Sequence, residues 1–181
     1  RQLVKARTIL EEIMPYADGK VRGYALPKIP LAWYFEGAEY HLSQQYDKAL
    51  ACYQNALKGF IELRKTDDEI SVLRHIAEIK GTLYDVAGSE NAYKQALSLS
   101  RQTGKSDAQM EILKELWKIG KTIGDVQQAQ AYAASIDSLV DATSDLQTKY
   151  TYYNQKGNEA RDLGQYGIAE QWYLRGKYIA E

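Results

Sequence analysis

The stretch WYFEGAEYHLSQQYDKALACY, residues 33–53, contains a pattern that occurs four times in this chain of 181 residues, with a constant period of 40. One column of the pattern is small in every copy, and its members are Ala49, Ser89, Ala129 and Ala169. A second column, which lies earlier in each copy, contains Gly37, Ala77, Trp117 and Gly157. A constant period of this length predicts repeated units stacked on one another.

Each copy is interpreted as two helices joined by a short turn. In the first copy, Trp33, Gly37 and Tyr40 lie on one helical stripe, and a second apolar stripe begins at Tyr46. Turns are expected at Ser43–Gln45, Tyr84–Asp85, Gly124–Asp125 and Gly164–Gln165. A small residue at each crossing would let the two backbones approach closely. The sequence therefore predicts an array of helical hairpins.

The hairpins are expected at 31–66, 67–106, 107–144 and 145–181, after a leading half-unit and a Pro/Gly loop in residues 1–30. All three prolines lie in that first part, and we interpret 15–30 as an ordered loop, with a flexible lid or a mimic of a bound peptide as alternatives. Three links between units fit the capping box, in which side chains satisfy the first backbone N–H groups of a helix. These are Thr66-Asp67-Asp68-Glu69, Ser106-Asp107-Ala108-Gln109 and Ser144-Asp145-Leu146-Gln147.

Composition narrows the classes of function. The net charge of −1 argues against a nucleic-acid binder that depends on phosphate contacts. Cys52 is the only cysteine, which excludes an intrachain disulfide and a thiolate zinc site and favours a reducing compartment. We favour the cytoplasm, with the periplasm as the alternative for part of a sensor, and we expect no membrane span. The chain begins inside a unit, so we interpret it as a fragment of a longer protein.

Trp33, Gly37, Tyr40, Ala49 and Tyr53 fit the pattern W-x₂-L-G-x₂-Y followed by A-x₃-F. On this match residues 31–181 resemble the tetratricopeptide repeat family. This chain departs from the pattern in two places. Glu36 occupies the position where Leu is usual, and the closing Pro is missing from all four copies. The period of 40 rather than 34 is similar to that of bacterial regulators and sensor kinases and of animal polarity scaffolds. The resemblance implies an all-α, right-handed α-solenoid that recognises a protein or peptide on its inner surface.

Columns whose chemistry changes from copy to copy are free to serve recognition. Three such columns lie on one stripe of the first helix of each unit, which by the resemblance faces the concave groove. The predicted peptide-binding residues are Tyr34, Ala38, His41, Arg74, Glu78, Lys114, Lys118, Lys121, Asn154, Asn158 and Arg161. They grade from aromatic to basic and amide-rich, which suits an extended peptide with an apolar end and an acidic end. The alternative is a solvated face on which Glu111, Glu115 and Asp162 screen the cations.

Catalysis and cofactor binding have little support in the sequence. His41 and His75 are expected on different helices and lack the local spacing of a metal motif, and His75 is interpreted as a surface residue. Cys52 is interpreted as a small core residue. We therefore expect no enzyme, no catalytic residue, no metal and no cofactor.

Two hypotheses of function follow. The first is a protein- or peptide-binding scaffold module, the recognition part of a larger bacterial regulatory protein. The alternative is a sensory input domain of a signal-transduction protein, which acts by a change of superhelical curvature or by dimerisation. Nucleic acid is not expected as a partner. Terminal repeats with exposed faces would also allow a homo-oligomer.

Overall fold

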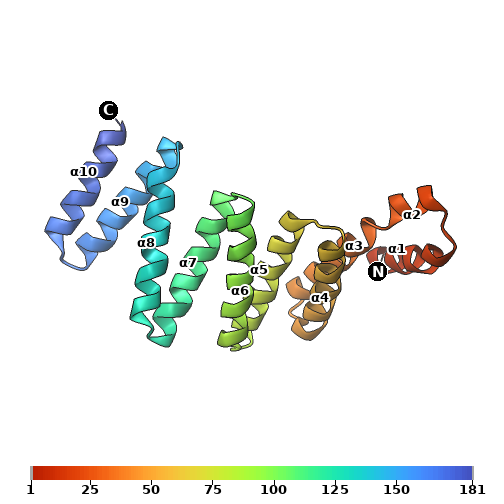
Figure 1. Ribbon diagram of the computed structural model, residues 1–181. Helices are drawn as coiled ribbons and strands as arrows, with labels where there is room; N and C mark the ends of the chain where they lie inside the picture. The colour runs from red at the N-terminus through yellow and green to blue at the C-terminus, as the bar shows by residue number, and fades with distance from the viewer. Residues whose placement is uncertain (1, 181) are drawn as a thin grey trace.

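The computed structural model describes residues 2–180, which form ten α-helices and one short 3₁₀ helix and contain no strand. Figure 1 shows these helices as a single row in which the two termini lie at opposite ends. The elements are α1 (Gln2–Ile13), η1 (Met14–Tyr16), α2 (Gly19–Ala25), α3 (Lys28–Leu42), α4 (Tyr46–Glu62), α5 (Thr66–Thr82), α6 (Val86–Gln102), α7 (Ser106–Ile123), α8 (Val126–Ala142), α9 (Leu146–Asp162) and α10 (Tyr166–Ala180).

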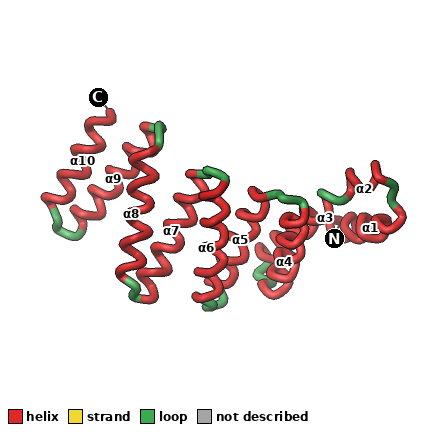
Figure 2. Tube along the Cα trace, in the orientation of Figure 1, coloured by secondary structure: helices red, strands yellow, loops and turns green. Residues whose placement is uncertain are grey.

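Successive helices pack as antiparallel hairpins, and this confirms the predicted all-α solenoid. The pairs are α3 with α4, α5 with α6, α7 with α8 and α9 with α10, and α1 packs on α3 ahead of them. Short loops separate the helices of each pair, as the tube in Figure 2 shows. No described helix is both long enough and apolar enough to cross a membrane.

The turns between α3 and α10 share one backbone device, which recurs at regular intervals along that part of the chain. Residues 44, 64, 84, 104, 124 and 164 all have a positive φ, between 55° and 77°. The N–H of the next residue then bonds a carbonyl in the last turn of the helix, as in Gln45 to Tyr40 at 2.9 Å and Lys65 to Phe60 at 2.9 Å. This is the Schellman arrangement, which satisfies carbonyls that the helix end leaves free. Position 144 is the exception: Thr143, which ends α8, is extended, with a ψ of 146°.

Packing at the hairpin crossings explains why the column of Ala49, Ser89, Ala129 and Ala169 is small in every copy. Ala49 is fully buried and Ala129 is 5% exposed. A Cβ built at Gly37 would lie 3.0 Å from the ring of Tyr53, and one at Gly120 would lie 3.2 Å from the backbone N of Ala129. In the third hairpin, whose second column contains Trp117, the close approach falls at Gly120 instead. The core that these crossings enclose is continuous from α4 to α9 and includes the fully buried side chains of Phe60, Ile79, Ile112, Leu113 and Leu116.

Two local expectations differ from the structure. Residues 15–30 are mostly helical rather than a loop, because Asp18 caps α2 through a bond from Val21 N at 2.8 Å. Pro27 and Pro30 lie at the N-cap and in the first turn of α3, where the missing N–H groups have no helical partner in any case. These prolines therefore start a helix instead of breaking one.

The predicted capping boxes also do not form at the starts of α5 and α7. The tight left-handed turns make Lys65 and Lys105 the N-cap residues, so the hydroxyl residues fall inside the helix and no side chain caps either start. At α9 the cap is Asp145, whose carboxylate accepts from Gln147 N at 3.0 Å. The helix starts were placed to within a residue, but the capping chemistry was wrong.

Candidate groove on the first helices of the hairpins

Three pockets follow one another along α3, α5, α7 and α9, the first helices of the four hairpins. The first, of about 440 Å³, is lined by Tyr34, Ser71, Arg74, His75, Glu78, Tyr93 and Glu115. The second, of about 280 Å³, lies between α5, α6 and α7 and includes Glu78, Tyr93, Glu115 and Lys118. The third, of about 190 Å³, lies between α7, α8 and α9 and includes Lys114, Glu115, Lys118, Tyr152, Gln155, Lys156 and Glu159. Because neighbouring pockets share lining residues, they form one groove, which we call the inner groove.

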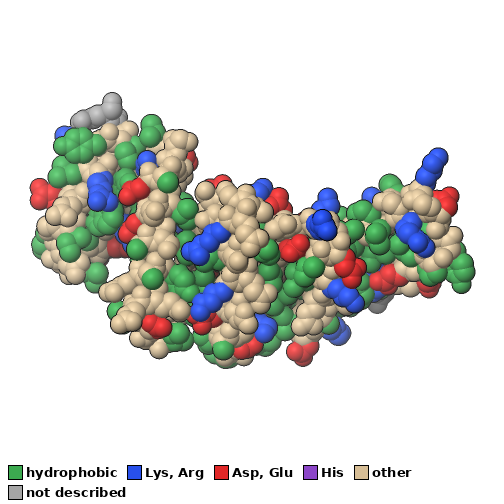
Figure 3. All heavy atoms as spheres, viewed as in Figure 1, with side chains coloured by type: hydrophobic (Ala, Val, Ile, Leu, Met, Phe, Trp, Pro, Cys, Tyr) green, Lys and Arg blue, Asp and Glu red, His purple; other side chains and the backbone are tan. Residues whose placement is uncertain are grey.

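Charges in the inner groove are of both signs and are mostly paired. Arg74 lies 2.6 Å from Glu111, and Lys118 lies 2.7 Å from Glu115. Lys114 is exposed and makes no ion pair with another described residue. Charges of both signs are also mixed on the face of the molecule drawn in Figure 3, with no field of a single sign. Surface ion pairs of this kind contribute about 0–1 kcal/mol each to stability, so a charged group of a ligand can replace one partner at little cost.

The first pocket ends in a cluster of aromatic and imidazole rings. The Tyr34 hydroxyl and His75 Nε2 lie 3.1 Å apart. The His75 ring stacks on Tyr53 with centroids 5.3 Å apart and planes 9° apart, and His41 meets the same tyrosine edge-on at 6.4 Å. Burial lowers the pKa of His75, with Glu78 opposing that shift, so the imidazole is held neutral more firmly than a free histidine. His75 therefore belongs to the groove and is not the simple surface residue that was expected.

Five of the predicted residues line the inner groove, namely Tyr34, Arg74, Glu78, Lys114 and Lys118. His41 lies beside it against Tyr46 and Tyr53, Ala38 is half-buried on the same helix, and Lys121 lies over the Trp117 ring at 4.5 Å.

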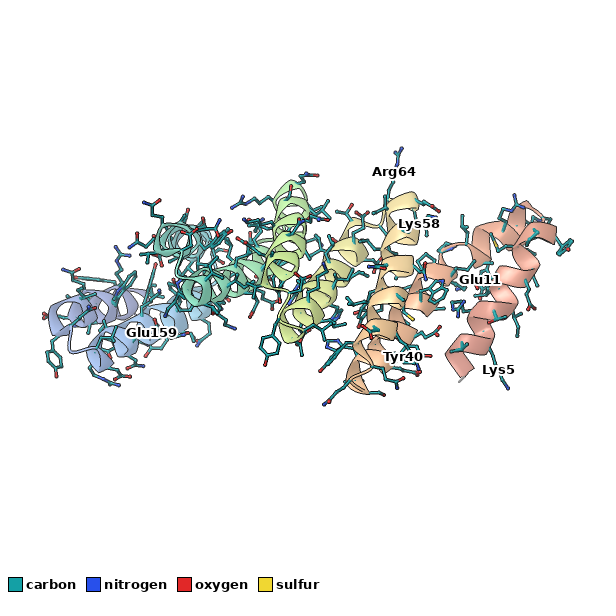
Figure 4. The ribbon with its side chains drawn as sticks, turned by 90° about the horizontal axis from the view of Figure 1, so that it is seen from below. Lys5, Glu11, Tyr40, Lys58, Arg64 and Glu159 are labelled. Atoms are coloured by element: carbon teal, nitrogen blue, oxygen red, sulfur yellow. The ribbon has the colours of Figure 1, made fainter. Side chains whose placement is uncertain are left out.

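The predicted residues of the fourth hairpin lie elsewhere. Tyr173 on α10 donates to Asn158 at 2.8 Å, and Asn154 lies 3.3 Å from the position of a Cβ at Gly176 on α10. Arg161 pairs with Asp162 at 3.0 Å. The groove is formed between neighbouring hairpins, so α9 contributes the face that looks back at α7. The residues of α9 that the sequence analysis missed are Tyr152, Gln155, Lys156 and Glu159, the last of which is labelled in Figure 4.

A second polar cluster anchors α1 to the first hairpin. The Arg7 guanidinium lies 3.4 Å from the centroid of the Trp33 ring and donates to Glu36 at 3.0 Å, and Trp33 Nε1 donates to Glu11 at 3.0 Å. In Figure 4, Glu11 lies between α1 and the first hairpin. Glu36 is only 5% exposed, so this ion pair explains why a charged residue occupies a motif position that is usually Leu.

Cys52 lies beside that cluster and is 4% exposed. Burial, followed by the charge of Glu36, raises the pKa of the Cys52 thiol to about 11. The thiol is therefore protonated near neutral pH and packs as a small core side chain.

The class that these observations define is an all-α helical-repeat solenoid with a groove on one side. No protein-family model and no curated protein matches the chain. Among solved structures the fold is similar to that of BtubC (BKLC) from P. vanneervenii, with a TM-score of 0.62 and 18% sequence identity. That match covers 99% of this chain and 73% of the other. At this identity the likeness shows the fold alone.

Proposed function

We propose that this chain is a non-catalytic protein- or peptide-binding module, the recognition part of a larger bacterial regulatory protein, and that its ligand is an extended peptide in the inner groove. One observation carries the proposal: the three pockets are joined through shared residues, chiefly Glu78, Glu115 and Lys118. Separate pockets suit small ligands, whereas a line of joined pockets suits an extended chain that places one or two side chains in each.

The chemistry of the groove favours a peptide that is acidic toward its α7–α9 end. Lys114 makes no ion pair with a described residue, and Lys156 lies 5.5 Å from the Tyr152 ring, so both ammonium groups can take a carboxylate. Gln155 offers an amide that both donates and accepts, as a peptide backbone requires. At the other end, the rings of Tyr34 and His75 offer contact area for an apolar side chain.

A peptide-display selection tests this proposal, with the wild-type chain and Lys114→Glu as targets. The matched control is Lys58→Glu, because Lys58 is also exposed and forms no ion pair with a described residue, but it lies on α4, outside the groove (Figure 4). We expect acidic or C-terminal motifs to be enriched by the wild type and by Lys58→Glu, and to be lost with Lys114→Glu. If all three proteins enrich the same motifs, or if the wild type enriches none, the groove is not the binding site.

A second candidate function is favoured by the link between α8 and α9. This link lacks the left-handed residue found at the other turns, and α8 contacts α9 only sparsely. A sensory input domain that acts by changing its curvature would bend there. Small-angle scattering with and without the selected peptide would test this, because bending changes the radius of gyration, and an unchanged curve would contradict it. Dimerisation would appear as a change of mass in the same samples.

A further inference from the structure

We propose that His41, His75 and Glu78 form a binding site for a divalent transition-metal ion, with Zn²⁺ as the ion that fits it best. One ligand atom from each residue lies within 4.8 Å of the other two. The chain contains only two histidines, and the fold brings both of them to this point. This inference does not rest on the proposed peptide binding, although His75 and Glu78 also line the inner groove.

The backbone places the three side chains on two adjacent helices. His75 and Glu78 are three residues apart on α5, so they lie on one face of that helix. His41 is in the last turn of α3, and its ring centroid lies 6.1 Å from that of His75. Sequence spacing gave no sign of this site because the histidines come from different hairpins.

Hydrogen bonding leaves one nitrogen of His75, Nδ1, available. Its Nε2 lies 3.1 Å from the Tyr34 hydroxyl, while its Nδ1 is buried and has no hydrogen-bond partner among the residues that the structure describes. The Nδ1 atom is 3.6 Å from Glu78 Oε2, which is longer than a hydrogen bond. When Nε2–H donates to Tyr34, the lone pair of Nδ1 points to the Glu78 side. Metal-binding histidines are commonly held in one tautomer by a bond of this kind.

A second orphaned polar atom lies in the same cluster. Tyr53 is fully buried, and its hydroxyl has no hydrogen-bond partner in the described part of the chain. Its ring stacks on His75 and is met edge-on by His41. Buried polar atoms without partners are rare in folded proteins, and this cluster contains two of them, one on the His75 ring itself and one on Tyr53. A metal bound to Nδ1 would take up the free lone pair of His75.

The closure that a metal requires is small. Four-coordinate Zn²⁺ with bonds of about 2.0–2.2 Å keeps its ligand atoms about 3.3 Å apart, so the cluster must contract by about 1.5 Å at most. Glu78 is exposed and has a flexible side chain that can make this movement. Two imidazoles and one carboxylate suit Zn²⁺, whereas Mg²⁺ and Ca²⁺ prefer oxygen ligands alone. His75 and Glu78 also line the first pocket, so the remaining coordination position opens toward the inner groove and is filled by water.

Isothermal titration with ZnCl₂ at pH 7.5 tests the site in the full chain. We expect one Zn²⁺ per chain and at least a tenfold loss of affinity in His41→Ala and in Glu78→Gln. Glu159→Gln is the matched control, because it removes the same charge from another pocket of the same groove and should leave the affinity unchanged. Co²⁺ in place of Zn²⁺ should give d–d absorption bands that Glu78→Gln alters.

The His75 ring packs on Tyr53, so His75→Ala is interpreted only if its far-UV circular dichroism matches that of the wild type. If it does not, the test rests on His41→Ala and on Glu78→Gln, which alters an exposed side chain. The proposal is overturned if the wild type binds no Zn²⁺ at 1 mM, or if the wild type, Glu78→Gln and His41→Ala bind it equally. The same holds if Ca²⁺ or Mg²⁺ displaces Zn²⁺ at equal concentration.

Discussion

Replacing Gly157 with alanine would test how closely the two helices of a hairpin must approach. A Cβ at this position would lie 2.5 Å from Cε1 and 2.6 Å from Cδ1 of Tyr173 on α10. Non-bonded carbon atoms need about 3.5 Å, so the ring would have to retreat by about 1 Å. The Tyr173 hydroxyl donates to Asn158 at 2.8 Å, and this bond holds the ring in place.

The magnitude follows from three contributions. Forcing a methyl group into such a contact costs about 1–3 kcal/mol. Alanine in place of glycine in a helix returns about 1 kcal/mol, and loss of the exposed hydrogen bond adds about 0.5 kcal/mol. We therefore expect Gly157→Ala to lower the free energy of unfolding by about 0.5–2.5 kcal/mol, which is about 1–10 °C in Tm for a chain of this size.

Thermal unfolding followed by circular dichroism would measure this change. Gly167→Ala is the matched control, because Gly167 is also helical but a Cβ there would meet nothing within 4 Å, so its Tm should stay level or rise. In a Tyr173→Leu background, where the ring is gone, Gly157→Ala should become neutral or stabilising. A rise in Tm equal to that of Gly167→Ala in the wild-type background would refute the close approach.

Three further outcomes are expected. Ala129→Leu overpacks the crossing of α7 and α8 and should cost about 1–3 kcal/mol in chemical denaturation, whereas an unchanged midpoint would contradict the crossing. Arg7→Met leaves Glu36 buried without its cation and should cost about 3–5 kcal/mol, with faster amide exchange in α1; unaltered protection of α1 would count against this anchor. Tyr152→Phe removes the hydrogen bond to Asp137, which is 2.5 Å long, and should lower the free energy of unfolding by about 1.5–3 kcal/mol. Amide exchange should then accelerate more in α9 and α10 than in α3–α8, and an equal change in all helices would contradict this.

The fold was predictable because its packing repeats with the sequence. Ala49 and Ser89 are one period apart, and both are buried at the equivalent crossing of two successive hairpins. The turns after α3 and α5 fall where the pattern placed them. What the pattern missed is local: Gln44, Arg64 and Tyr84 adopt a left-handed conformation that their residue types rarely favour. Tertiary packing of the two helices determines those turns, and propensity alone would not indicate them.

The groove was only partly predictable, because comparing equivalent positions ignores contacts between neighbouring units. Tyr34 was compared with Arg74, one period later, but its hydrogen-bond partner is His75. His41 approaches the same histidine from further along α3. The first helices of adjacent hairpins lie beside one another, so a residue meets positions shifted from its own equivalent. A comparison of each residue with the positions next to its equivalent in the following copy would have brought Tyr34 and His75 together.

The link at residues 143–145 makes the fourth hairpin different from the others, and this bears on both proposed functions. The other turns between α3 and α10 close with a left-handed residue, but here Thr143 is extended and α8 contacts α9 sparsely. Two tyrosines of α9 instead reach back to α8, Tyr152 to Asp137 and Tyr153 to Asp141. The third pocket of the inner groove lies between α7, α8 and α9 and is lined by Tyr152, so a change in the angle between α8 and α9 would change its width. A ligand held between Lys114 and Lys156 would bind more tightly at one width of this pocket than at others, and it would shift the population of molecules toward that width. Recognition of a peptide and a change of curvature would then be two consequences of the same binding event.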